Sequence, residues 1–148
     1  MTDSALDAER FDVIAWDDPV VRRIGFAHDH PYVETHWLPV LGPTATWLLR
    51  RLATELAGRP GGLGVDAALL AASLGVARSG GGRGAFGRAL QRCVMFGVVR
   101  MERGGEVPLL VVRTHVPPLS RRQLERLAPI LAPGRGSPAS DEAVTGGS

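Results

Sequence analysis

One stretch of the chain, residues 66–100, decides the expected fold; it reads DAALLAASLGVARSGGGRGAFGRALQRCVMFGVVR. Asp66 is a suitable N-cap for a short helix from Ala67 to Leu74, which Gly75 would end. A glycine-rich loop, expected to be flexible, follows from Arg78 to Gly84. An amphipathic helix is then expected from Ala85 to Phe96. The stretch therefore predicts two helices joined through a glycine loop.

A longer helix is expected before this stretch and a β-hairpin after it. Pro43 suits the first turn of a helix, and Leu48, Leu49, Leu52 and Leu56 recur on one side of it at helical spacing. After Gly97 the hydrophobic period changes from that of a helix to that of a strand. Aliphatic runs at Val98–Arg103 and Glu106–Arg113 are joined by Gly104-Gly105, a dipeptide that suits a tight hairpin turn.

The sequence after the hairpin predicts one more helix. Ser120 and Gln123 fit a capping box, with Leu119 and Leu124 as its hydrophobic staple. Pro129 must end or kink this helix, because its ring cannot continue the hydrogen-bond pattern.

The expected domain organisation has three parts. Residues 1–12 are expected to be a flexible acidic leader, residues 13–131 a single domain, and residues 132–148 a disordered tail of Gly, Pro, Ser and Ala. Within the domain, residues 13–41 are the least regular. Short strands could form at Val13–Trp16 and Val20–Phe26, and Tyr32–Val40 could be helical or extended.

The order helix, short helix, glycine loop, helix and hairpin resembles the winged helix-turn-helix superfamily over about residues 43–114. Leu70–Val76 resembles the end of the second helix and the turn of such domains. Arg88–Arg100 resembles a recognition helix that runs into the first wing strand. The resemblance implies an α+β fold, mainly α with a small β-hairpin wing, here with an extra C-terminal helix. It also implies binding to double-stranded DNA.

Composition and charge fit a DNA-binding protein. The chain has 148 residues and a net charge of +2. This value hides a balance of −5 over residues 1–36 and of +9 over residues 37–135. A basic segment of this kind favours polyanions. All 17 basic residues are arginine and asparagine is absent, which indicates a bacterial genome rich in G and C.

The predicted recognition helix has one apolar and one polar face. At 100° per residue, Phe86, Leu90 and Cys93 share the apolar face. Arg88, Gln91 and Arg92 lie opposite, where Arg could read guanine and Gln adenine in the major groove. The full set of predicted DNA-binding residues also takes in arginines of the loop and hairpin: Arg78, Arg83, Arg88, Gln91, Arg92, Arg100, Arg103 and Arg113.

Other functions are less well supported by the sequence. The glycine loop lacks the Lys-Ser/Thr of a P-loop, and no constellation of catalytic residues is visible, so an enzyme and a bound cofactor are not expected. A metal centre could draw on His28, Asp29, His30, Glu34 and His36, but turn and cap roles are the simpler interpretation. Trp16, Trp37 and Trp47 are expected in the core, and the lone Cys93 in packing.

The expected protein is a transcriptional regulator, or an accessory of replication or of a mobile element. With one cysteine and no long apolar run, it is expected in the cytoplasm, at the nucleoid and away from membranes. A homodimer could form through the C-terminal helix. The alternative is a winged helix that docks other proteins within a complex, because fold alone does not settle function.

Overall fold

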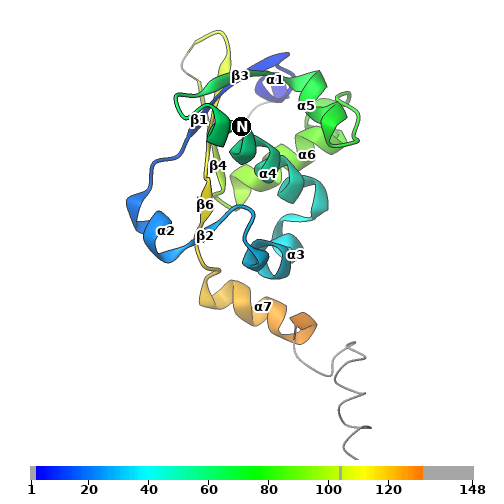
Figure 1. The fold of residues 1–148 in the computed structure, drawn as a ribbon. Coiled ribbons are helices and arrows are strands. Elements are labelled where there is room, and N and C mark those ends of the chain that lie inside the picture. The colour runs from blue at the N-terminus through cyan, green and yellow to red at the C-terminus, as the bar shows by residue number, and fades with distance from the viewer. Residues whose placement is uncertain (1–2, 104, 132–148) are drawn as a thin grey trace, which may run out of the picture. The chain divides into compact units, whose positions relative to one another are not determined.

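The structure is a computed structural model that describes residues 3–103 and 105–131. The chain divides after Pro118 into two units. The first carries a four-stranded sheet and the helices α1 to α6 (Figure 1). The second carries α7 (Arg121–Leu131). Each unit is described by itself below.

The sheet has the strand order β3-β1-β5-β4. The strand β1 (Arg10–Ala15) lies between β3 (Leu63–Asp66), to which it is antiparallel, and β5 (Pro108–Val112), to which it is parallel. The strand β4 (Val99–Arg103) pairs with β5 as an antiparallel hairpin. The expected hairpin is thus confirmed at its strands, while its turn residue Gly104 lies outside the described residues. The strand β3 was not predicted.

Three helices occur in the order expected from the sequence, and β3 lies between the first and the second along the chain. They are α4 (Pro43–Gly58), α5 (Ala67–Ser73) and α6 (Ala85–Met95). The carboxylate of Asp66 caps α5 by accepting a hydrogen bond of 3.0 Å from the backbone N–H of Leu69. Both α4 and α6 pack against the sheet (Figure 1). The mixed α+β class predicted from the sequence is confirmed.

The core lies between the sheet and these helices. Phe11 and Val13 of β1 and Leu110 of β5 are fully buried on the inner face, and the Phe11 ring lies 6.5 Å from that of Phe86 on α6. The alternate residue Asp12 is exposed on the outer face, as the two-residue period of a strand requires. The predicted leucines of α4 are all buried.

The N-terminal segment differs from the flexible leader expected over residues 1–12. From residue 3 onward it contains α1 (Asp3–Leu6) and the first half of β1. Ala5 and Leu6 are 5% and 2% exposed. These apolar side chains are removed from water, so the segment is part of the packed structure. Its acidic composition had suggested a flexible leader.

The short strand considered at Val20–Phe26 is not present over most of that range. Residues 19–27 form α2 (Pro19–Ile24) and the two-residue strand β2 (Phe26–Ala27), which pairs with β6 (His115–Val116). Asp18 caps α2 by accepting a hydrogen bond of 3.2 Å from Val21 N–H, and Pro19 occupies the first turn. This N-terminal signal outweighs the β-branched residues that follow it.

The region 32–40, left open between helix and extended chain, is helical. A π-helical turn, Val33–Trp37, leads into α3 (Leu38–Leu41). Trp37 is 2% exposed and donates a hydrogen bond of 2.9 Å to the carbonyl of Pro117. Trp37 therefore lies in the core, as the sequence predicted.

In the second unit, α7 begins with the predicted capping box. Ser120 N–H donates to the side chain of Gln123, and Gln123 N–H donates to Ser120 Oγ, at 2.9 and 3.2 Å. Leu124, expected in the hydrophobic staple, is 41% exposed. The helix continues past Pro129 to Leu131. The predicted disordered tail, 132–148, lies outside the described residues.

Candidate nucleic-acid interface

The two faces of α6 lie as the sequence predicts. Phe86, Leu90 and Cys93 are fully buried. Arg88 and Arg92 are exposed, and Gln91 is half-buried. Burial raises the pKa of the Cys93 thiol to about 12, which makes this cysteine a packing residue and not a nucleophile.

Two of the predicted contact residues on α6 are engaged by the protein's own backbone. The guanidinium of Arg92 donates to the carbonyls of Leu41 and Val40, at 2.8 and 2.7 Å. The side-chain amide of Gln91 donates to the carbonyl of Gly82 at 2.9 Å. The partners of Arg92 are uncharged carbonyls, so its positive charge is not neutralised by them. The bond to Gly82 takes one of the two N–H donors of Gln91 and leaves the other for a base.

Arg78 and Arg113 hold distant segments together. Arg78 Nη2 donates to the carbonyls of Leu6 and Ala8, the latter at 2.8 Å. Arg113 donates to the carbonyl of Gly97 at 2.8 Å and forms an ion pair of 3.0 Å with Asp18. These two arginines are therefore built into the fold.

The arginines of the β4–β5 hairpin, Arg100 and Arg103, have exposed side chains. Arg100 forms an ion pair of 2.7 Å with Glu102. Its guanidinium lies 4.6 Å from the ring centre of Trp16, and that of Arg113 lies 3.8 Å from the same ring. Arg103 is exposed on the same hairpin. Trp16, expected in the core, is instead a half-buried contact for two arginines.

Arg83 and Arg88 differ from the other predicted residues. Both are exposed, and neither side chain forms a hydrogen bond or ion pair with another residue of the part of the chain that the structure describes. Arg88 also lines a groove of about 260 Å³ between α6 and the first turn of α4, together with Arg92. Two positive side chains thus border one groove.

The glycine loop is folded onto α6. Residues Gly81–Arg83 form a 3-10 turn. A Cβ atom on Gly87 of α6 would lie 1.9 Å from the carbonyl oxygen of Gly81, so only glycine lets the loop approach the helix this closely. The sequence predicted a flexible loop, and in the structure its turn Gly81–Arg83 packs against Gly87 of α6.

Sequence reasoning missed several exposed apolar side chains. Trp47 on α4 was expected in the core but is 58% exposed. Leu69 on α5 and Met95 on α6 are each 72% exposed. The signal was present in both helices, because the helical angle of Trp47 places it opposite the leucine face of α4 and that of Met95 places it opposite the apolar face of α6.

The possible metal ligands of the sequence lie at residues 28–36, within the described part of the chain. Among residues 3–103 and 105–131, no three His, Cys, Asp or Glu side chains come together in a way that could hold a metal ion. Glu34 instead pairs with Arg50 at 3.2 Å. Burial holds the pKa of His28 below its usual value of 6.5, so its neutral form is favoured.

Comparisons with known proteins identify a fold and no family. No protein-family model matches the chain, and a search of curated proteins finds no match. No helix within the described ranges is both long and apolar enough to cross a membrane.

The α+β arrangement is similar to a solved structure, that of primosome protein DnaB (residues 1–300) from Geobacillus stearothermophilus. The match has a TM-score of 0.52 and 15% sequence identity, and it covers 88% of this chain and 47% of that one. The chain thus spans about half the length of the matched structure. At this identity the likeness shows the fold alone.

Proposed function

We propose that the protein binds duplex DNA as a winged helix. In this proposal α4, α5 and α6 are the three helices, α6 is the recognition helix, and the β4–β5 hairpin is the wing. The strand β3 between the first two helices supports it, because the order helix, strand, helix, helix, hairpin is that of a winged helix. The added strand β1 then widens the sheet of the domain.

The exposed face of α6 carries the proposal. Arg88 is exposed and unpaired within the described residues, and Arg92 is held by two uncharged carbonyls. Both side chains therefore keep a full positive charge at one groove. A phosphate there would meet a charge already fixed in position, so little side-chain entropy would be lost on binding.

The other predicted residues differ in how directly they could contact phosphate in this proposal. Arg83 adds a third exposed positive charge in the turn before α6, and Arg103 adds an exposed charge on the wing. Arg100 and Arg113 already face carboxylates, so a phosphate would have to compete with Glu102 or Asp18. Arg78 and Gln91 would act by positioning the loop.

The biological role we propose is the handling of duplex DNA in a bacterial cytoplasm, as a regulator or within a replication complex. The likeness to a primosome protein supports the replication branch. The role is one of binding and not of catalysis. A homodimer through α7 would supply the second half-site that one such module needs for useful specificity.

A salt titration tests the proposal. Binding to random 30-base-pair duplex is measured by fluorescence anisotropy between 50 and 300 mM salt, for the wild type and for Arg83→Ala/Arg88→Ala. If both arginines meet phosphates, the double variant loses affinity and its log–log salt slope is shallower by about 1.8, since each contact contributes about 0.9.

The matched control is Arg23→Ala/Arg51→Ala. It removes the same charge from exposed positions on α2 and α4. This variant should keep the wild-type slope. Equal slopes for both double variants would contradict a local DNA site, and absence of binding by the wild type at about 50 mM salt would overturn the proposed function.

A second candidate function is a protein-docking winged helix. The exposed Trp47, Leu69 and Met95 favour it, because large apolar side chains and Trp in particular are enriched at interface centres. In that case Trp47→Ala/Leu69→Ala abolishes the protein's function in cells while DNA affinity is unchanged. The reverse result, with Arg83→Ala/Arg88→Ala as the damaging pair, favours DNA binding.

A further inference from the structure

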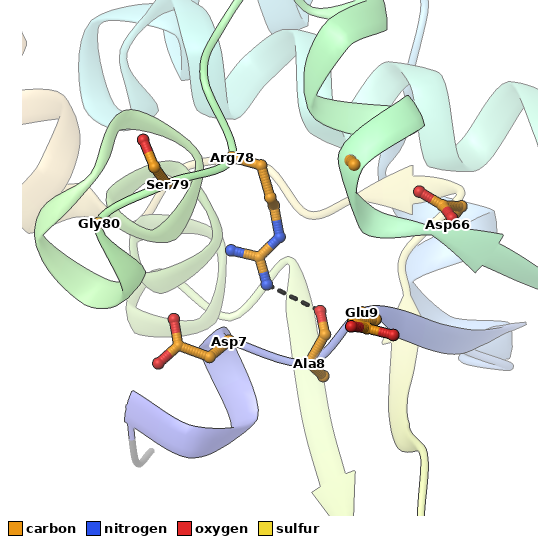
Figure 2. A pocket seen from close by; sticks show the side chains of 8 residues that line it. Asp7, Ala8, Glu9, Asp66, Arg78, Ser79 and Gly80 are labelled. Atoms are coloured by element: carbon orange, nitrogen blue, oxygen red, sulfur yellow. Dashed lines mark hydrogen bonds between the residues drawn. The ribbon is translucent and has the colours of Figure 1, made fainter.

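The acidic N-terminal segment lies against the glycine loop that precedes α6. Arg78, at the start of the loop, donates hydrogen bonds to the carbonyls of Leu6 and Ala8, so the two segments are tied together. The buried side chains of Ala5 and Leu6 also anchor this segment. Figure 2 shows Arg78 reaching from the loop to Ala8.

Asp7 lies closest to the loop. Its Oδ1 atom is 2.8 Å from the point where a Cβ atom on Gly81 would lie. The absence of a side chain on Gly81 therefore lets a carboxylate rest on the turn Gly81–Arg83. That turn also contains Arg83, one of the unpaired arginines of the proposed DNA surface.

The surroundings of Asp7 are acidic. A cavity of about 380 Å³ beside the loop is lined by Asp7, Glu9 and Asp66, with Arg78 as its one basic residue (Figure 2). Asp66 is occupied in capping α5, whereas Asp7 and Glu9 have exposed side chains. At physiological salt, charges act over about 8 Å, so two carboxylates at this loop weaken its attraction for phosphate.

We infer that the carboxylates of Asp7 and Glu9 compete with the phosphates of nucleic acid for the glycine loop. This inference rests on the proposed function. Asp7 lies against the turn that contains Arg83, and Glu9 lines the cavity beside the loop. Both carboxylates lower the attraction of this turn for phosphate, and with it the affinity for any duplex. Contacts made by α6 to a preferred site are left intact, so the segment suppresses non-specific binding more than specific binding.

The experiment compares two variants that each remove two negative charges. Asp7→Asn/Glu9→Gln alters the segment beside the loop with side chains of the same shape. Asp29→Asn/Glu55→Gln removes the same charge from exposed positions away from the loop. Affinity for a random 30-base-pair duplex is measured by anisotropy at 50, 100 and 300 mM salt, and thermal unfolding checks that both variants fold.

The expected result is an affinity about threefold to tenfold higher for Asp7→Asn/Glu9→Gln at 50 mM salt, with the gain vanishing at 300 mM as screening increases. The control pair should change affinity by less than half as much on the logarithmic scale. Equal gains for both pairs, or no gain for either, overturn the inference but leave DNA binding standing. Failure of the wild type and of both variants to bind overturns the inference and the proposed function together.

Discussion

The Nε atom of Arg92 donates a hydrogen bond of 2.8 Å to the carbonyl oxygen of Leu41, which ties the exposed face of α6 to the C-terminus of α3. Helix C-termini leave carbonyls without partners, and this arginine satisfies two of them, those of Leu41 and Val40. Arg92 therefore stabilises the fold and also carries charge, whereas Arg88 carries charge alone.

Arg92→Ala should lower the free energy of unfolding by about 1–2 kcal/mol, because two backbone carbonyls lose a charged donor. Arg88→Ala, at an exposed site without a partner among the described residues, should change it by less than about 0.5 kcal/mol. Urea denaturation of the two variants measures both values. Equal destabilisation would show that the bonds from Arg92 to α3 add nothing to stability.

Gly87→Ala should destabilise the protein strongly. Its new methyl group would lie 1.9 Å from the carbonyl oxygen of Gly81, so the loop or α6 must shift. Overpacking of this kind costs about 1–3 kcal/mol. Gly58→Ala is the control, since nothing lies within 4 Å of a Cβ atom there and the residue closes α4. Thermal unfolding should show a lower Tm for Gly87→Ala alone.

Asp18 should make stability depend on pH in the acid range. The hydrogen bond from Arg113, and then that from Val21 N–H, hold the pKa of this carboxyl below its ordinary value of 3.8. The unfolded chain therefore takes up the proton first, so the stabilisation is present above pH 3.8 and is lost as pH falls through the lower folded-state pKa.

Asp18→Asn removes this charge and keeps an N-cap acceptor. We expect it to be less stable than the wild type at pH 7, with the difference shrinking below pH 3.8. Thermal unfolding between pH 7 and pH 2.5 measures this. A constant difference across that range would argue against the pairing of Asp18 with Arg113.

His28 should destabilise the fold on mild acidification. Burial lowers its pKa from 6.5, so the unfolded state binds a proton at a pH where the folded state does not. The free energy of unfolding should fall as pH drops from 6.5 toward the folded-state pKa. In His28→Gln the slope between pH 7.5 and pH 5.5 should be shallower. An unchanged slope would assign that pH dependence to other groups.

Local signals were sufficient for most of the helices and the hairpin. The leucine spacing of α4, the Asp66 cap of α5 and the capping box of α7 each act over a few residues, and all three are present. A similar signal at Asp18-Pro19 was overlooked. The β-branched residues that follow it suggested a strand, whereas Asp18 and Pro19 begin the helix α2. The acidic composition of the first residues likewise hid the apolar pair Ala5 and Leu6.

The sequence by itself determined which side of α6 is polar, because helical geometry sets the direction of each side chain from its position alone. Only the tertiary structure decided which arginines are available to a partner. Arg78, Arg92 and Arg113 find acceptors 70, 51 and 95 residues away along the chain. Such pairings depend on where the segment after α1, the end of α3 and the start of α2 pack, and no local pattern encodes that. Arg83 and Arg88 are left as exposed charges because none of the described segments brings an acceptor to them.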